Sequence, residues 1–255
     1  MYALERHESI ANLAARRGRV SVSDLAATYG VTTETIRRDL DVLERTGVLR
    51  RVHGGAVPTS ALTVTERGLS ERDETMSSEK DRIAKAAVEL LPGPGGSVLL
   101  DGGTTTARLA RLLPVERQLT VVTNSVPVAA RLAGTSGLHV HMLGGRIRGL
   151  TQAAVGDEAV RTLDDLRVDV AFLGTNAFDA EHGLTTPHPD EAAVKRAMVK
   201  AGAVVVVLAD SSKVGRLDLH RFASFDQVDV LVTDAGVDAA ARRALRAHDV
   251  EVVVA

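Results

Sequence analysis

The residues best suited to chemistry are short polar stretches that directly follow apolar runs in the second part of the chain. Asp101-Gly102-Gly103 follows the run 98–100 and precedes three threonines. Two glycines let a ligand approach the backbone N–H groups closely, and hydroxyls and a helix N-terminus add donors and positive partial charge. This combination predicts a site for a phosphate monoester. The stretch is neither a P-loop nor Gly-x-Gly-x-x-Gly, which disfavours nucleotide hydrolysis and dinucleotide binding.

Three further apolar runs end in the same kind of residue, at 123–125, 144–146 and 174–176. One such loop is more often a structural turn. Four of them indicate a shared crevice for a polar, anionic ligand, because the carboxyl ends of parallel strands lie at one edge of a sheet.

Two lysines and a glutamate extend this set. Glu191 and Lys195 are one helical turn apart, so they either form a surface ion pair or face the crevice and bind sugar hydroxyls and phosphate. Lys213 follows a buried strand, which favours a phosphate contact. The candidate ligand-binding residues are Asp101, Gly102, Gly103, Thr104, Thr105, Thr106, Thr123, Asn124, Ser125, Gly144, Gly145, Asn176, Glu191, Lys195 and Lys213. His182 and His188 fit no common metal-site spacing, so we expect no metal and no cofactor.

The elements that position these residues alternate between strand and helix, which predicts an α/β domain with a mostly parallel sheet covered on both faces. A helix from about residue 78 to 91 precedes them. The expected strands are 98–100, 119–123, 140–143, 168–173, 204–208, 228–232 and 250–253, and the expected helices are 104–113, 125–133, 156–165, 190–201 and 237–247.

The first sixty residues predict a different module. Apolar residues recur at helical spacing over 3–17 and 33–45, and a short helix begins after Ser21 and ends near Gly30. Two short helices joined by a tight turn behind a longer helix form a helix-turn-helix. The run 48–56 turns at Gly54-Gly55, which predicts the hairpin of a winged helix-turn-helix.

The second helix of such a motif enters the DNA major groove, where arginine pairs with guanine and hydroxyls contact phosphates. A small protein-binding module with ordinary surface arginines is the alternative. The candidate DNA-binding residues are Thr32, Thr33, Glu34, Thr35, Arg37, Arg38, Arg50, Arg51 and His53.

Composition narrows the remaining classes. The 255 residues include no cysteine, which excludes disulfides and thiol nucleophiles and fits a cytoplasmic protein. Two tyrosines, four phenylalanines and no tryptophan are too few for the stacking surfaces of most single-strand nucleic-acid binders. No apolar run is long enough to span a membrane. The first sixty residues hold nine arginines against seven acidic residues, so DNA binding requires a fold that gathers those arginines on one face.

The chain resembles the DeoR family of bacterial transcriptional repressors. The resemblance rests on Thr35-Ile-Arg-Arg-Asp-Leu40 followed by Arg50-Arg-Val-His-Gly-Gly-Ala56, and it continues through Asp101-Gly-Gly-Thr-Thr-Thr106, Glu191-Ala-Ala-Val-Lys195 and Ala209-Asp-Ser-Ser-Lys213. It covers residues 5–235.

The resemblance implies a sensor domain similar in fold to ribose-5-phosphate isomerase that binds phosphorylated sugars or polyols as inducers. Ala177 stands where many members have glycine, and its Cβ is expected to narrow the crevice. The stretch Gly183-Leu-Thr-Thr-Pro187 is most similar to members that regulate uptake of fructose or another ketose phosphate.

Together these observations predict a winged helix-turn-helix at 1–57, a linker at 58–77 and a sugar-phosphate-sensing domain at 78–255. The expected function is a homo-oligomeric repressor, a dimer or tetramer, that binds double-stranded operator DNA and that a phosphorylated sugar releases. The alternative is a sugar-phosphate isomerase with an accessory module. Asp101, Glu191 and Asp210 are candidate bases for it, but the run Asp-Gly-Ala-Asp-Glu of that isomerase family is absent.

Overall fold

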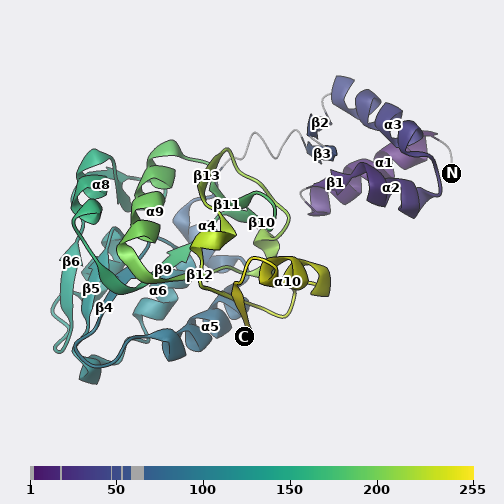
Figure 1. Cartoon of the computed structure of the whole chain (residues 1–255). Helices are drawn as coiled ribbons and strands as arrows, with labels where there is room; N and C mark the ends of the chain where they lie inside the picture. Colours follow the sequence, from purple (N-terminus) through teal and green to yellow (C-terminus); the bar gives the residue numbers. More distant parts are fainter. Residues whose placement is uncertain (1–2, 18, 47, 53, 59–65) are drawn as a thin grey trace. The chain divides into compact units, whose positions relative to one another are not determined.

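The computed structural model describes residues 3–17, 19–46, 48–52, 54–58 and 66–255. The main division of the chain falls after residue 65 and gives two compact units (Figure 1). Helix α4 (Leu69–Glu74) and helix α5 (Ser77–Ala87) fold with the second unit, and α4 lies within the range 58–77 that was expected to be linker. Arg108 of the second unit binds both helices. Its guanidinium donates to Asp81 Oδ1 of α5 at 2.8 Å and to the backbone oxygen of Asp73 in α4 at 2.9 Å.

The N-terminal unit consists of three helices and a small sheet. Ser21 accepts the N–H of Asp24 at 3.1 Å and starts the second helix, and Gly30, with φ of 62°, ends it. Ile10, Ile36 and Leu40 are fully buried at its centre. The elements are α1 (Ala3–Arg17), β1 (Val20–Ser21), α2 (Val22–Tyr29), α3 (Thr33–Arg45), β2 (Leu49–Val52) and β3 (Gly55–Pro58), with the strands in the order β1-β3-β2.

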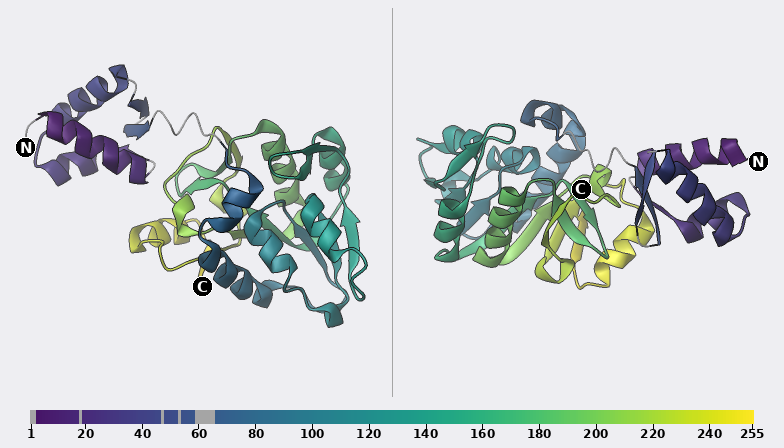
Figure 2. Two further views of the ribbon diagram at one scale, coloured as in Figure 1. Left: turned by 180° about the vertical axis from the view of Figure 1, so that it is seen from behind. Right: turned by 90° about the horizontal axis from the view of Figure 1, so that it is seen from above.

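The second unit is built on a seven-stranded parallel sheet, which confirms the expected α/β class (Figures 1 and 2). Its strand order is β15-β14-β12-β9-β4-β5-β6, so the order reverses between β4 and β9. The strands are β4 (Ser97–Leu100), β5 (Thr120–Thr123), β6 (His139–Met142), β9 (Val168–Gly174), β12 (Gly202–Leu208), β14 (Val230–Thr233) and β15 (Glu251–Val254).

Helices cover both faces of this sheet because successive strand residues point to opposite sides. Val98 and Leu100 pack with α5, α6 (Thr104–Ala110) and α7 (Val126–Leu132). Leu99, between them in the sequence, packs with the other layer. That layer consists of α8 (Asp157–Asp164), α9 (Pro189–Ala201) and α10 (Ala239–Arg246).

Five short strands of the second unit were not expected from the sequence. β7 (Arg146–Arg148) and β8 (Ala153–Val155) form an antiparallel pair, and β10 (Ala177–Asp179), β11 (Gly183–Thr186) and β13 (His220–Ala223) form a separate antiparallel sheet. Single turns of 3-10 helix lie at Val88–Leu90, Val115–Arg117, Ser211–Lys213 and Phe225–Gln227. Among the described residues, every helix is too short or too polar to cross a membrane.

Candidate functional sites

The polar centre of the second unit lies where the strand order of the sheet reverses. Asp101 follows β4, and Gly174 ends the neighbouring strand β9. Lys195 of α9 joins them: its ammonium group pairs with Asp101 Oδ2 and donates to the backbone oxygen of Gly174 at 2.8 Å. The N–H of Gly174 in turn donates to Asp101 Oδ2 at 3.0 Å. A reversal of this kind opens a crevice outside the carboxyl ends of the strands, which is where such sheets bind ligands.

Asn124 fixes the loop after β4 against the loop after β5. Its side-chain oxygen accepts the N–H of Gly102 at 2.8 Å, and its side-chain nitrogen donates to the backbone oxygen of Ala154 at 3.2 Å. A Cβ on Gly102 would come within 2.8 Å of the Cβ of Ala153. Glycine is therefore required at position 102 by close packing against β8.

Glu191 is a buried carboxylate at the same centre. Its Oε1 accepts from the hydroxyl of Thr151 at 2.6 Å and from Nη1 of Arg148 at 3.1 Å. The hydroxyl of Thr186 lies 3.5 Å from Oε2. Burial favours the neutral acid, but Thr151, Lys195 and Arg148 outweigh it and hold the pKa of Glu191 below its ordinary value. The carboxylate is therefore charged near neutral pH and can accept hydrogen bonds from ligand hydroxyls.

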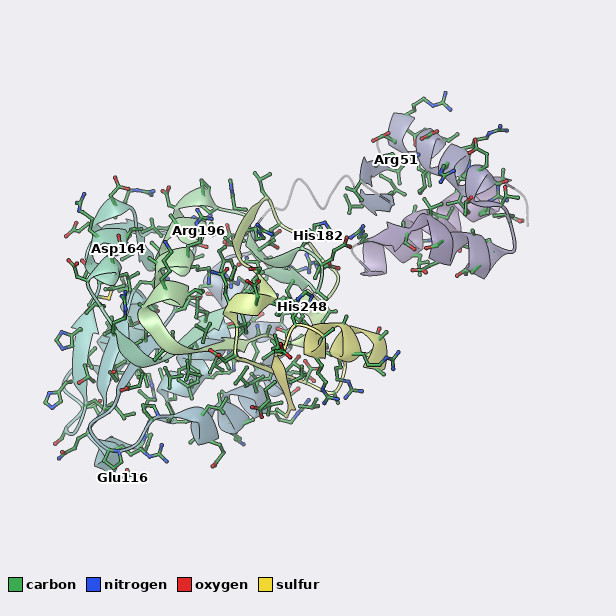
Figure 3. The ribbon with its side chains drawn as sticks, viewed as in Figure 1. Arg51, Glu116, Asp164, His182, Arg196 and His248 are labelled. Carbon is green, nitrogen blue, oxygen red and sulfur yellow. The ribbon has the colours of Figure 1, made fainter. Side chains whose placement is uncertain are left out.

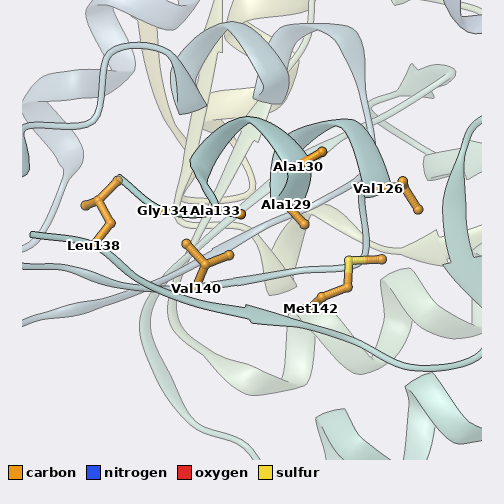
Figure 4. Close-up of a pocket in the computed structure, with 8 residues that line it drawn as sticks. All are labelled: Val126, Ala129, Ala130, Ala133, Gly134, Leu138, Val140 and Met142. Carbon is orange, nitrogen blue, oxygen red and sulfur yellow. The ribbon is translucent and has the colours of Figure 1, made fainter. Parts of the chain in front are cut away.

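Part of this network lines one small pocket. Its lining comprises Asp101, Gly102, Asn124, Ala153, Glu191 and Lys195. A larger groove with about 870 Å³ of empty space lies elsewhere, between α7 and β6 (Figure 4). Residues such as Val126, Val140 and Met142 make that groove apolar, so it suits a phosphorylated sugar poorly.

Several candidate ligand-binding residues form hydrogen bonds within the loops around the pocket. The hydroxyl of Thr106 donates to the backbone oxygens of Asp101 and Gly103, at 2.7 and 2.9 Å. Thr123 donates to the backbone oxygen of Leu100 at 2.7 Å, and Ser125 caps α7. These three side chains shape the loops around the pocket and do not line it. Thr104 and Thr105 are buried in the first turn of α6, outside the pocket lining.

Gly144, Gly145 and Asn176 also lie outside the pocket lining. A Cβ on Gly144 would meet the carboxylate of Glu158 at 2.6 Å, and Gly145 has a φ of 124°, so both glycines serve the turn before β7. Asn176 is linked to the site through Thr186, whose hydroxyl lies 3.4 Å from the Asn176 side-chain oxygen.

Lys213 lies in a different polar cluster, with Asp210 and Lys80. Lys80 is a buried residue of α5 whose ammonium group donates to the backbone oxygen of Arg72. Burial lowers the pKa of Lys80 to about 8, the positive charges of Lys213, Arg108 and Arg72 lower it too, and Asp210 opposes them. Lys213 does not line the pocket around Asp101.

Ala177 and the two loop histidines lie outside the lining of this pocket. Ala177 is an extended residue of β10 paired with Thr185, and it lies outside the pocket lining that its Cβ was expected to narrow. His188 caps α9 by accepting the N–H of Asp190 at 3.3 Å. His182 is exposed and lies 3.1 Å from Asp179 Oδ1 (Figure 3).

In the N-terminal unit, α3 presents a polar face to solvent. Arg37 and Arg38 have side chains that are 55% and 79% exposed, each 3.6 Å from a carboxylate oxygen of Glu34. Thr33 is exposed as well. Thr32 caps the helix by accepting the N–H of Thr35 at 3.2 Å, and the two hydroxyls lie 2.9 Å apart. The exposed arginines stand at the N-terminal half of the helix, where a recognition helix contacts DNA.

Of the three candidate residues of the wing, Arg51 is the one whose side chain the structure describes. Arg51 attaches the wing to α3: it pairs with Asp41 and donates to the backbone oxygen of Arg37 at 3.1 Å (Figure 3). Strand β2 contains Arg50, but the Arg50 side chain and the whole of His53 lie outside the described residues.

Sequence reasoning missed several residues of these sites. Asp39 is buried in α3 and pairs with Arg6, Nε to Oδ2, at 2.6 Å. Its signal was present, because Asp39 falls on the same helical face as Ile36, Leu40 and Leu43. Arg148, Thr151 and Glu66 join the Glu191 network without a comparable signal, since β7 and the residues around it carry no clear period.

Comparisons with known proteins assign both units. Residues 6–61 match the DeoR-like helix-turn-helix domain, and residues 75–235 match the DeoR C terminal sensor domain. A ribose 5-phosphate isomerase A from Methanocaldococcus jannaschii is a structural neighbour with a TM-score of 0.40 and 21% identity, over 55% of each chain.

Relatives match along nearly the whole chain. A putative aga operon transcriptional repressor from Escherichia coli O157:H7 is 38% identical over 98% of this chain and 93% of its own length. The regulator GlpR from Haloferax volcanii is 39% identical over 99% of this chain and 98% of its own length. The glycerol-3-phosphate regulon repressor from Escherichia coli K12 is 30% identical over 98% of each. The chain belongs to the DeoR family of helix-turn-helix transcriptional regulators, and it is a DNA-binding regulator, not an enzyme.

Proposed function

We propose that the protein represses genes of carbohydrate metabolism and that a phosphorylated sugar, of which a fructose or other ketose phosphate is the foremost candidate, releases it from its operator. The observation that carries this proposal is the pocket at the reversal of the strand order, where Asp101, Glu191 and Lys195 converge. The names of relatives support the class of effector, since one is a glycerol-3-phosphate regulon repressor.

The chemistry of the pocket suits a polyhydroxylated anion held in one orientation. Asp101 and Glu191 are acceptors for sugar hydroxyls and repel a phosphoryl group. The proposed partners of the phosphoryl group are therefore the backbone N–H groups that begin α6, at Gly103 to Thr105. Lys195 neutralises part of the charge of the two carboxylates. Lys213, in the 3-10 turn Ser211–Lys213 that follows β12, is a further proposed contact to the phosphoryl group.

The N-terminal unit is the proposed operator-binding domain. Arg37, Arg38 and Thr33 are exposed on α3, where they can reach base edges and phosphates of a major groove. We propose that Arg51 holds the wing against α3 and that Arg50 and His53 contact the DNA backbone. Operators of helix-turn-helix proteins repeat about one helical turn apart, which favours a dimer or a tetramer of this chain.

The effector assignment is tested by thermal unfolding of the full chain with fructose 1-phosphate, fructose 6-phosphate, ribose 5-phosphate and glycerol 3-phosphate. Fructose and inorganic phosphate are the comparison ligands. A true effector at a hundredfold excess over its Kd stabilises the native state by about 2.7 kcal/mol. Lys195→Met should abolish that stabilisation, because Lys195 lines the pocket. Lys200→Met, at an exposed position of the same helix, should retain it.

Stabilisation by at least one sugar phosphate, but by neither fructose nor inorganic phosphate alone, supports the proposal. The proposal fails if none of the four sugar phosphates raises the melting temperature. The assigned pocket is wrong if Lys195→Met responds to the sugar phosphate as strongly as Lys200→Met does.

A further inference from the structure

Arg148 forms a bidentate ion pair with Glu66, the first residue of the second unit. Its Nη1 donates to Glu66 Oε1 at 2.9 Å, and its Nη2 donates to Glu66 Oε2 at 2.5 Å. The two side chains are only 15% and 7% exposed. A bidentate arginine–carboxylate pair shielded from water is among the strongest hydrogen-bonded arrangements that proteins form. Glu66 is thereby fixed to strand β7.

The same guanidinium reaches the proposed effector pocket. Nη1 of Arg148 also donates to Glu191 Oε1, at 3.1 Å, so one N–H-bearing nitrogen serves two buried carboxylates. Thr151 donates to that oxygen of Glu191 as well, at 2.6 Å. Glu191 lines the pocket with Asp101. A change in the hydrogen bonding of Glu191 therefore alters the anchoring of Arg148.

Glu66 is the first residue of the second unit, and residues 67–74 follow it in the sequence. Gly68 lies near the side chain of Leu150, since a Cβ built on Gly68 would be 3.9 Å from Cδ1 of Leu150. Helix α4 begins at Leu69. The Glu66–Arg148 pair thus attaches the start of the segment 66–74 to the residues 148–151 that surround Glu191.

We propose that Arg148 is a positioning residue that couples the effector pocket to the segment 66–74, from which the chain continues toward the DNA-binding unit. This inference rests on the proposed function, because it assigns the pocket to the effector. An effector hydroxyl that donates to Glu191 Oε1 competes with Arg148 for the oxygen's lone pairs. Arg148 then keeps Glu66 as its only carboxylate partner in this network, and the segment 66–74 is held less firmly to the pocket wall.

The coupling is tested without any effector by hydrogen–deuterium exchange of the full chain. Glu191→Gln removes the charge that anchors Arg148 at the pocket. It should speed exchange of the amides of residues 69–75 by about threefold or more, the low end of the coupling expected within one ion-pair network. The amides of Arg72 and Thr75 are suitable reporters because they donate to Gly68 and Glu71 in α4.

The same Glu191→Gln change is then made in two arginine variants of strand β7. In Arg148→Met, the second substitution should have no additional effect on exchange at 69–75, because the link is already absent. Arg146 lies two residues from Arg148, and its side chain is 61% exposed. In Arg146→Met, the Glu191→Gln substitution should still speed exchange at residues 69–75 about threefold. If Arg148→Met does not fold, Glu66→Gln breaks the same pair from its other end, and the same insensitivity is expected.

The proposal is overturned if Glu191→Gln leaves exchange at 69–75 unchanged. It is also overturned if the effect of Glu191→Gln persists in both Arg148→Met and Glu66→Gln, since the two sites would then communicate by another route or Arg148 would only stabilise the fold. Because no sugar phosphate is added, such a failure leaves the proposed effector untouched. A negative thermal-unfolding screen, in turn, would refute the effector and leave the coupling standing.

Discussion

Asp39 shows how one side chain makes the stability of the N-terminal unit depend on pH. Its Oδ1 lies 2.8 Å from Nε2 of His7 and accepts from Nη2 of Arg6 at 3.0 Å. Burial raises the pKa of Asp39, but the hydrogen bonds and charges of Arg6 and His7 outweigh it, so the pKa lies below its ordinary value. A carboxyl group with a lowered pKa stabilises the folded state above its unfolded pKa of about 3.9. That contribution is lost as the pH falls through the folded pKa.

We predict that Asp39→Asn lowers the free energy of unfolding of this unit at pH 7 by roughly 3 kcal/mol, because it breaks a buried ion pair. The variant should also lose part of the decline in stability that the wild type shows below pH 4. Tyrosine fluorescence measures this unit alone, since both tyrosines, at positions 2 and 29, lie in it and the chain has no tryptophan.

Asp41→Asn is the matched control for that measurement. Asp41 lies two residues further along α3, 57% exposed, and pairs with Arg51 at the surface. Its replacement should cost less than about 1 kcal/mol. Equal losses in the two variants would mean that the burial of the Asp39 pair contributes nothing.

Single residues differ in how far sequence can predict them. The position of Asp39 in the apolar stripe of α3 required a buried cationic partner, although the sequence did not name Arg6. Asp101, Asn124, Glu191 and Lys195 were expected at the ligand site, and the structure brings them together. The role of Arg148 could not be predicted, because it depends on a contact with Glu66, 82 positions away in the sequence.

At the scale of elements, burial decides what the sequence reveals. The five inner strands of the parallel sheet are mostly buried between two helical layers, so they appear as continuous apolar, largely β-branched runs with predictable positions, whereas the edge strands β6 and β15 are more exposed. Strands β7, β10 and β11 are short and mix polar with apolar residues, and they were missed. They nevertheless matter, since β7 carries Arg148 and β11 carries Thr186.

Helix α3 is the element with the clearest functional test. We predict that the double variant Arg37→Ala/Arg38→Ala weakens binding to an operator duplex by about ten- to hundredfold and lowers the salt dependence of binding. The duplex is selected by the wild-type chain from a randomised library, and binding is measured by fluorescence anisotropy at several salt concentrations.

Arg131→Ala/Arg161→Ala provides a control with the same change in net charge. Both arginines are exposed, on α7 and α8 of the second unit. That variant should bind the selected duplex nearly as well as the wild type. Unchanged binding by Arg37→Ala/Arg38→Ala would show that α3 is not the recognition helix.

At the scale of the whole molecule, the account requires the two units to exchange free energy. The pocket that we propose for the effector lies where the strand order reverses between β4 and β9, and the Glu66–Arg148 pair attaches the start of the second unit to the wall of that pocket. An effector can shift DNA binding only by the difference between its affinities for the bound and released states. This topology could not be derived from the order of helices and strands in the sequence, because many strand orders fit the same succession.

The most direct test of the account is the Kd of the full chain for the selected duplex, measured by anisotropy at fixed salt with and without each of the four sugar phosphates. We predict that at least one of them raises the Kd by about 5- to 150-fold, the usual range of allosteric coupling, and that fructose and inorganic phosphate do not. A Kd that stays constant across all four sugar phosphates, while one of them demonstrably stabilises the chain, would contradict the claim that this pocket controls DNA binding.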